Sequence, residues 1–459
     1  MKKNSFKLRL RKNRTSSLSM IIMLYVTIIF LGSLLLSLPI SSANKQWSNY
    51  TDALFTATSA TCVTGLVTVD TFMQWSMFGQ IVILFLIETG GIGLMTAIAM
   101  LTRSFGFRLR FKDRKFLMES VGFKDKSGFK HVVLTILIGS AIFETLGAAI
   151  LCIRFIPDFG VSRGIYFSIF HSISAFCNAG FDLMGYYGTE YASFTMYAHD
   201  PLVLITLSVL IFTGGLGFIV WDDFVNSRFK FKDMRLHTQI MLMGSVTLII
   251  MSMFFLYLLE FDNALADESF GNKLLSVFFQ AITARTAGFN AIDMAKLNES
   301  SLIYTIFMMF IGAGPGSTAG GIKVTTFIIV ALGTISLVSR NGEITLNQKK
   351  ITRETLNQAL AIVVAFFIII FIFTTTILWL EPEKEMVDVM FEVVSAVGTV
   401  GMTSGLVTAS FGLVSKLLLI LLMFIGRVGI LTIVLSVTAG TKNKANETVI
   451  LPEENIMVG

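Results

Sequence analysis

The sequence predicts an all-α polytopic membrane protein in which four tandem units surround a pseudo-fourfold pore axis. Two observations predict this fold class. Of the 459 residues, 54% are hydrophobic and only 14% are charged, which is far from the usage of a soluble domain. In addition, Gly65, Gly180, Gly288 and Gly401 each end a similar short motif and are separated by 115, 108 and 113 residues. This repeat indicates four copies of one membrane unit.

Each unit is predicted to contain a spanning helix (M1), a re-entrant pore loop (P) and a second spanning helix (M2), which makes eight transmembrane helices and four pore loops. About 20 apolar residues suffice to cross a bilayer as a helix. The runs that meet this length are 18–40 and 75–102 in unit 1, 132–153 and 201–221 in unit 2, 238–259 and 301–339 in unit 3, and 355–380 and 417–438 in unit 4. The first run imitates a secretory signal peptide, but its 23 uncharged residues favour a spanning helix.

The loops between these runs complete the expected domain organisation. It consists of a basic N-terminus (1–17), unit 1 (18–102), a basic loop (103–131), unit 2 (132–226), a loop (227–237), unit 3 (238–339), a loop (340–354), unit 4 (355–440) and a tail (441–459).

The distribution of basic residues predicts the orientation. Residues 103–130 carry nine Lys and Arg against three acids, and the positive-inside rule places such loops in the cytoplasm. The protein is therefore expected to cross the lipid bilayer of the plasma membrane several times, with both termini in the cytoplasm. Its pore loops should open toward the extracellular side. Acidic residues flank two pore loops: Glu260, Asp262, Asp267, Glu268, Glu381, Glu383, Glu385 and Asp388. They form either a cation-concentrating mouth or ordinary solvated loops.

The four pore loops are expected at 50–70, 164–183, 270–292 and 386–407, which are too short or too polar to span. Each should enter as a half-helix and return as extended backbone that carries its glycine. Non-helical backbone at membrane depth persists only where protein or a wet cavity surrounds it. Four such segments around one axis would supply that cavity.

The fourth pore loop contains the sequence Thr-Val-Gly, which is the centre of potassium-channel filters, where backbone carbonyls replace the hydration shell of the ion. The four equivalent triplets are Val63-Thr64-Gly65, Asn178-Ala179-Gly180, Thr286-Ala287-Gly288 and Thr399-Val400-Gly401. Glycine lacks a Cβ and tolerates unusual φ and ψ, so carbonyls can turn toward an ion. We expect these residues to bind K⁺ through backbone carbonyls.

The second helix of unit 3 is an apolar run of 39 residues with a polar, glycine-rich interruption. The interruption consists of Gly312, Ala313, Gly314, Pro315, Gly316, Ser317, Thr318, Ala319, Gly320 and Gly321. The helix that precedes it rises about 15 Å at 1.5 Å per residue, so the interruption should lie near the bilayer midplane beneath the filter. We expect an intramembrane loop across the permeation path that gates it.

A similar calculation places Arg427 at the same depth, where an arginine costs at least ~2.5 kcal/mol on insertion scales and is by default functional. In the cavity below the filter it would repel a permeating cation and complete the gate. The alternative is a structural pair with Glu88 or Glu144. Lys323 either anchors the loop or snorkels inward. Glycines that align with this region in units 1 and 2 are expected to serve close helix packing.

An enzyme is not predicted, because neither a nucleophile–base arrangement nor a metal-ligand spacing is visible. The four histidines are scattered, and Cys62, Cys152 and Cys177 are interpreted as small apolar packing residues without a disulfide. Residues 316–323 imitate a phosphate-binding loop but lack its Gly-Lys-[Ser/Thr] ending. We expect no covalently bound cofactor and no nucleic-acid partner.

The combination of these features resembles the Trk/Ktr/HKT superfamily of potassium transporters. The resemblance rests on four M1-P-M2 units, one glycine per filter segment, the run 282–289, the glycine-rich break and the arginine of the last helix. Eight spans without an additional N-terminal helix pair, together with the tail 451–459, are similar to the KtrB type. Only one glycine stands in each filter segment, whereas full channel signatures carry two.

The resemblance implies potassium uptake by a homodimer with one pore per subunit, docked on a cytosolic KtrA-like ring of RCK-type subunits that binds ATP or ADP. It also implies that residues 312–321 and Arg427 gate the pore, and that Gly65 favours potassium over sodium. Passive entry and entry with Na⁺ as an activating or coupled ion are both compatible with it. Rival interpretations are a secondary transporter for an organic solute and a membrane scaffold, although such carriers show two-fold rather than four-fold repeats.

Overall fold

The computed structural model describes residues 17–92, 129–338, 344–346, 349–404 and 410–429. Most of the basic segments that predict the orientation, namely 1–16 and 103–128, and the tail 441–459 lie outside the described residues. The described chain is mostly helical, as predicted. Its one described sheet is the antiparallel hairpin of β1 (Ile344–Leu346) and β2 (Lys349–Ile351).

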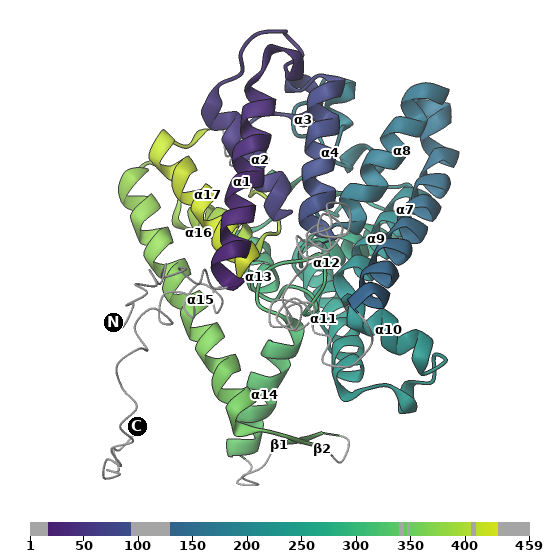
Figure 1. Cartoon of the computed structure of the whole chain (residues 1–459), viewed down its shortest axis with the longest axis vertical. Coiled ribbons are helices and arrows are strands. Elements are labelled where there is room, and N and C mark those ends of the chain that lie inside the picture. The colour runs from purple at the N-terminus through teal and green to yellow at the C-terminus, as the bar shows by residue number, and fades with distance from the viewer. Residues whose placement is uncertain (1–16, 93–128, 339–343, 347–348, 405–409, 430–459) are drawn as a thin grey trace, which may run out of the picture.

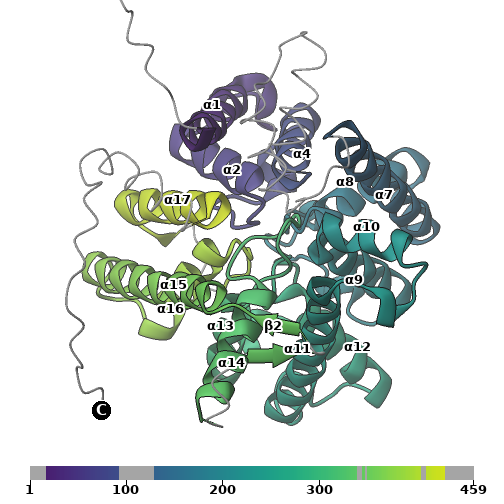
Figure 2. The same cartoon turned by 60° about the horizontal axis from the view of Figure 1, so that its bottom comes forward.

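Four groups of helices follow one another around the molecule (Figures 1 and 2). They are α1 (Ser17–Ser37), α2 (Tyr50–Cys62), α3 (Thr71–Gln74) and α4 (Met77–Gly91); α7 (Phe129–Phe159), α8 (Val161–Phe176), α9 (Pro201–Leu216) and α10 (Phe218–Asn226); α11 (Leu236–Glu260), α12 (Phe270–Thr283), α13 (Glu299–Phe310) and α14 (Val324–Val338); and α15 (Arg353–Leu380), α16 (Met386–Gly398) and α17 (Leu413–Val428). The last group returns to the first, since α17 packs against α2.

The short helices α2, α8, α12 and α16 begin the four predicted pore loops. Polar side chains define where two of them start: Asn49 accepts a hydrogen bond from Thr51 N at 3.0 Å, and Ser269 accepts one from Asn272 N at 3.4 Å. Such capping satisfies amides that have no partner within the helix. Each helix then ends two or more residues before its filter glycine, so the chain leaves helical geometry where the sequence predicts it.

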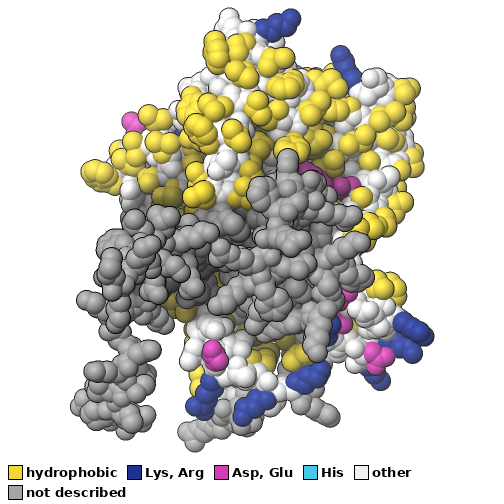
Figure 3. All heavy atoms as spheres, in the orientation of Figure 1, with side chains coloured by type: hydrophobic (Ala, Val, Ile, Leu, Met, Phe, Trp, Pro, Cys, Tyr) yellow, Lys and Arg dark blue, Asp and Glu magenta, His cyan; other side chains and the backbone are white. Residues whose placement is uncertain are grey.

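The outer surface is apolar. Three described helices are long and apolar enough to cross a membrane alone, at Leu134–Phe159, Leu236–Glu260 and Arg353–Leu380. Large hydrophobic side chains on them, including Phe254 and Phe371, are exposed. Figure 3 shows hydrophobic side chains over much of the described upper part of one face and a gathering of charged side chains at its lower end. An exposed apolar surface of this size is typical of a protein that faces lipid.

The second helix of unit 2 is not continuous, contrary to the predicted run 201–221. Helices α9 and α10 meet at a bend of 90°. Gly217 forms the bend with a φ of +97°, and a Cβ at this position would lie 2.6 Å from the Pro315 carbonyl oxygen. Only glycine combines this conformation with this close approach, so the break coincides with the contact to the glycine-rich segment of unit 3, which hydrophobic patterning does not reveal.

Two of the acids that flank the pore loops, which were expected either in a cation-concentrating mouth or in ordinary solvated loops, bind groups of neighbouring loops. Glu260 is 1% exposed and accepts hydrogen bonds from Asn298 N at 3.0 Å and Asn263 Nδ2 at 2.7 Å. Glu381 Oε1 accepts hydrogen bonds from Gly412 N and Ser415 Oγ, both at 2.8 Å. These carboxylates satisfy loop amides and hydroxyls, so they are not part of a freely solvated surface.

Glycines of the second helices let each one approach the end of its pore helix. A Cβ at Gly90, Gly214 or Gly426 would collide with a backbone carbonyl oxygen of the pore helix in the same unit, those of Thr61, Phe176 and Val397 respectively. The predicted role in close packing is therefore correct for units 1 and 2 and extends to unit 4.

Replacing Gly426 by Ala should destabilise the protein by about 1–3 kcal/mol, since overpacking a close contact forces the backbone to move. The melting temperature of the purified protein in detergent measures this loss. Gly271 is the matched control, because a Cβ there meets nothing within 4 Å, and Gly271→Ala should melt like the wild type. Equal melting of both variants would contradict the packing argument.

Candidate functional site

The four predicted filter glycines meet in a closed ring. A Cβ at Gly65 would lie 2.6 Å from the Ala179 carbonyl oxygen, and one at Gly180 would lie 2.5 Å from that of Ala287. In the same way Gly288 faces the Val400 carbonyl and Gly401 faces that of Thr64. Each glycine thus contacts the carbonyl that precedes the next glycine, and the fourth returns to the first.

The backbone reaches this ring by the same path in three units. The residue two positions before the glycine adopts the left-handed conformation, with φ of 56° at Val63, 58° at Asn178 and 51° at Thr399. Such a φ is uncommon outside glycine, and for a β-branched residue it marks local strain. Thr286, the equivalent residue of unit 3, is absent from the residues with positive φ. Unit 3 therefore enters the ring by a different path.

Serines of the pore helices fix the filter amides. Ser59 Oγ accepts a hydrogen bond from Gly65 N at 3.0 Å, and Ser395 Oγ accepts one from Gly401 N at 3.1 Å. The equivalent Ser174 instead donates to the Phe181 carbonyl at 2.7 Å. Unit 3 has an isoleucine at this position, and the Thr283 carbonyl accepts the Gly288 amide at 3.3 Å. The amides of Gly65, Gly288 and Gly401 are thereby bound to their own pore helices, and these helices direct their negative C-terminal dipoles toward the ring.

A cavity of about 230 Å³ lies against one side of the ring. Its wall includes Gly65, Gly401, Asn290 and the acids Glu190 and Asp293. Burial raises the pKa of Tyr191, another wall residue, to about 12, so its phenol is neutral at physiological pH. The two acids of the wall, Glu190 and Asp293, place negative charge at this cavity, and negative charge attracts cations.

The glycine-rich segment of unit 3 lies against the other side of the ring. A Cβ at Gly320 would collide with the Thr399 side chain. Asn178 Nδ2 donates to Thr318 Oγ1 at 2.7 Å, and the Asn178 side-chain carbonyl accepts a hydrogen bond from Thr286 Oγ1 at 3.3 Å. The side chain of one filter residue thus joins the filter segment of unit 3 to the glycine-rich segment.

Backbone hydrogen bonds hold this segment against unit 2. Gly314 N donates to the Gly215 carbonyl at 2.8 Å, and Phe218 N donates to the Gly316 carbonyl at 3.0 Å. The two bonds lie on either side of the bend, the first at the end of α9 and the second at the start of α10. The bend and the segment therefore form one structural unit.

Arg427 binds backbone carbonyls rather than an acid. Its guanidinium donates to the carbonyls of Thr318 and Gly90. Among the described residues it forms no ion pair with Glu88 or Glu144, so the alternative of a structural acid pair is wrong. Lys323 Nζ donates to the Ala319 carbonyl at 2.7 Å and to that of Gly320 at 3.2 Å, which agrees with the anchoring alternative for this lysine.

Sequence reasoning assigned no role to Arg285, which the structure places between the filter and the glycine-rich segment. It is 5% exposed, and its guanidinium donates to the Gly312 carbonyl at 3.2 Å. Its other acceptors are the carbonyl and hydroxyl of Ser245, each at 3.5 Å. An arginine one residue before a filter triplet is the signal that could have identified it.

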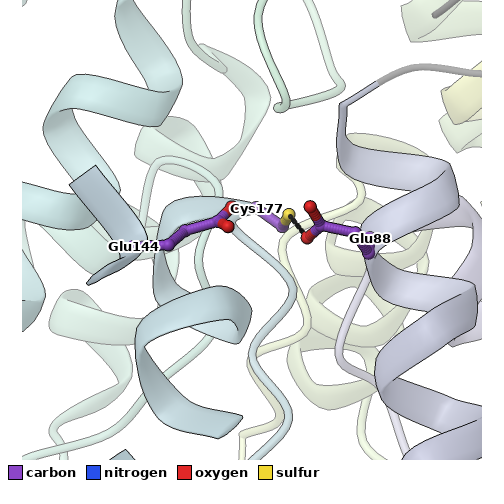
Figure 4. A group of neighbouring side chains, drawn as sticks. All are labelled: Glu88, Glu144 and Cys177. Carbon is purple, nitrogen blue, oxygen red and sulfur yellow. Dashed lines mark hydrogen bonds between the residues drawn. The ribbon is translucent and has the colours of Figure 1, made fainter. Parts of the chain in front are cut away.

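A cluster of three ligand-type side chains lies beside the filter of unit 2 (Figure 4). Glu88 from α4 and Glu144 from α7 approach Cys177, and their ligand atoms lie within 4.8 Å of one another. The thiol donates to Glu88 Oε2 at 3.6 Å, so Cys177 is more than an apolar packing residue. Three such ligands fall short of the four that close a structural zinc site, and no fourth joins them in the described part of the chain.

Comparison with known proteins gives consistent results. The family model of TrkH, described as a cation transport protein, matches residues 8–446. The chain is 39% identical over 416 residues to the Ktr system potassium uptake protein B of Bacillus subtilis, with 90% of each chain covered. It is 37% identical over 462 residues to the potassium/sodium uptake protein NtpJ of Enterococcus hirae, with 99% of each covered.

A solved structure shows the same fold. The crystal structure of the potassium transporter TrkH from Vibrio parahaemolyticus aligns with a TM-score of 0.71 at 17% identity, over 95% of this chain and 88% of that chain.

Replacing Ser395 by Ala should destabilise the protein by about 1 kcal/mol, because the half-buried Gly401 amide loses its acceptor. Thermal unfolding in detergent measures the change. Ser208 is the matched control, since this buried serine makes no side-chain hydrogen bond among the described residues, and Ser208→Ala should be neutral. A neutral Ser395→Ala would show that the serine does not hold the filter amide.

Proposed function

This chain belongs to the TrkH family of cation transport proteins as a KtrB-type member, and we propose that it takes up potassium ions across the plasma membrane through a channel-like filter. The observation that carries the proposal is the closed glycine ring. Each unit contributes one backbone carbonyl that lies against a ring glycine, namely those of Thr64, Ala179, Ala287 and Val400. Backbone carbonyls gathered in this way can replace the hydration shell of an alkali cation.

The proposed layout is eight membrane spans and four re-entrant loops, with the boundaries expected from the sequence. The cavity with Glu190 and Asp293 is then the outer entrance of the pore. The hairpin with Lys349 and Lys350, at the lower end of Figure 1, is on the cytoplasmic side. An inside-negative potential drives K⁺ inward with about 2.3 kcal/mol per charge per 100 mV.

The glycine-rich segment 312–321 and Arg427 are proposed to gate this path. Support comes from the contact of Gly320 with the Thr399 side chain and from the hydrogen bond between Arg427 and the Thr318 carbonyl. A segment against the inner side of the ring blocks an ion that leaves it. Because Arg427 holds this segment by its backbone, movement of either one changes the opening.

The proposed partners are a second copy of the chain and a cytosolic ring of nucleotide-binding regulatory subunits. The names of the relatives support a system of several components, since they describe Ktr system proteins. The name of the Enterococcus hirae relative also includes sodium. Na⁺ is therefore proposed as a second ion that activates or accompanies K⁺ transport.

Replacing Gly288 by Ser should lower the preference for K⁺ over Na⁺ by about tenfold, because a side chain at a strained positive φ displaces the Val400 carbonyl. Uptake of K⁺, Rb⁺ and Na⁺ into vesicles that contain the purified protein measures this ratio. Gly271→Ser, at an open position, should leave it unchanged. A folded Gly288→Ser variant with the wild-type ratio would contradict the filter assignment.

Replacing Arg427 by Ala should raise K⁺ flux severalfold, because hydrogen bonds from a charged donor, about 1.5–3 kcal/mol each, no longer hold the segment in place. The matched control is Lys416→Ala, which removes a cation of the same helix that lies 3.9 Å from Asp52 and away from the segment. Flux in vesicles, with folding checked by gel filtration, gives the comparison. The gate assignment fails if Arg427→Ala folds normally and conducts no faster.

A further inference from the structure

One position of the pore helices is buried behind the filter, and its side chain is polar in three of the four units. It lies nine residues before each filter glycine, and the four residues there are Thr56, His171, Phe279 and Glu392. All four side chains are completely buried. A buried imidazole and a buried carboxylate inside a membrane protein are costly unless they serve a purpose, and the filter contacts described above use neither.

In unit 2 the histidine joins the pore helix to the segment that leaves the filter. His171 Nδ1 lies 2.7 Å from the Phe167 carbonyl oxygen. A carbonyl only accepts, so Nδ1 carries the proton and Nε2 is the acceptor. Nε2 accepts a hydrogen bond from Leu183 N at 3.0 Å. Leu183 follows Gly180 by three residues, so the histidine fixes the backbone at the outer end of this filter strand.

In unit 4 a carboxylate takes the same place. Glu392 is fully buried, and neither oxygen makes a hydrogen bond of normal geometry within the described residues. The polar groups that interact with it are the Thr403 side chain and the Ser404 backbone. Ser404 follows Gly401 by three residues. The acceptor and the backbone group that it faces therefore occupy the same positions relative to the glycine as in unit 2.

The other two units lack this arrangement. In unit 1 the hydroxyls of Thr56 and Thr68 are both buried without a hydrogen bond among the described residues. In unit 3 the position is the apolar Phe279, which belongs to the hydrophobic core. Within the ring Gly180 contacts Gly65 and Gly288, whereas Gly401 lies opposite to it. The two units with a polar acceptor thus face each other across the axis.

We propose that His171 and Glu392 are positioning residues that hold the outer ends of two opposite filter strands and thereby set the discrimination between K⁺ and Na⁺. The inference rests on the proposed function and adds the residues that determine its specificity. Leu183 and Ser404 each lie three residues beyond a filter glycine. A strand that is fixed there, and by its pore helix before the glycine, cannot shift toward the axis, so its ring carbonyl keeps one distance from the ion. Without the acceptor the strand can close around a smaller ion.

The test compares two substitutions of similar size at each position. Gln keeps an oxygen that accepts the backbone amide, whereas the Met thioether is only a weak acceptor. His171→Met should lower the K⁺/Na⁺ uptake ratio in vesicles by about fivefold to tenfold, the effect of one lost buried hydrogen bond. Glu392→Met should shift the ratio in the same direction, because it removes the buried carboxylate that faces the strand beyond Gly401. His171→Gln and Glu392→Gln should stay within about twofold of the wild type. Phe279→Met is the matched control and should leave the ratio unchanged.

The outcomes separate this inference from the proposed function. If the wild-type chain moves neither ion, the proposed function fails. If it is selective and the folded Met and Gln variants have equal ratios, the positioning role is overturned and the charge or size of the side chain decides. Should a Met variant not fold, the corresponding Ala variant replaces it. If the Met and the Ala variant at one position both fail to fold while Phe279→Met folds normally, the residue has a role in folding alone, and this result would also overturn the proposal.

Discussion

The structure depends on one steric constraint, the direct contact of four backbone segments around the glycine ring. Each carbonyl occupies the space that the Cβ of the preceding unit's glycine would need. No unit can close the ring without the other three, because the contact that fixes each glycine comes from its neighbour. A single side chain at any of the four positions would push two segments apart. Glycine is therefore a requirement of the packing as much as of the backbone conformation.

The same kind of contact links the ring to the rest of the molecule. Second-helix glycines touch pore-helix carbonyls, and Gly320 of the intramembrane segment touches Thr399. Arg285 and Arg427 then bind the carbonyls of Gly312 and Thr318, at two points of that segment. Backbone carbonyls take the place of acids around both cations. Within the described residues, charged donors and backbone acceptors thus hold the segment without an ion pair to either arginine.

The repeat of one glycine per unit allowed the helix order, the four pore helices and the glycine ring to be predicted from the sequence. The bend at Gly217 was not predicted, because the glycines at 214, 215 and 217 also suit close packing of a continuous helix and the group that lies against the bend is a carbonyl from residue 315. Arg285 and His171 were visible as residues, but their partners are backbone groups that carry no sequence signal. The same reason explains why the sequence offered acids as the alternative partners of Arg427, whereas the structure gives it backbone carbonyls.

The symmetry of the molecule is a property of its backbone, and the side chains depart from it. Unit 3 lacks the left-handed residue, the serine and the polar acceptor that its neighbours use. It is also the unit in which a filter strand leads through a single helix, α13, into the intramembrane segment. Asn178 joins that strand to Thr318 by side-chain hydrogen bonds. Arg285 also donates to the Gly312 carbonyl, so side-chain hydrogen bonds connect the filter strand of unit 3 to the glycine-rich segment at two points, near residue 312 and near residue 318.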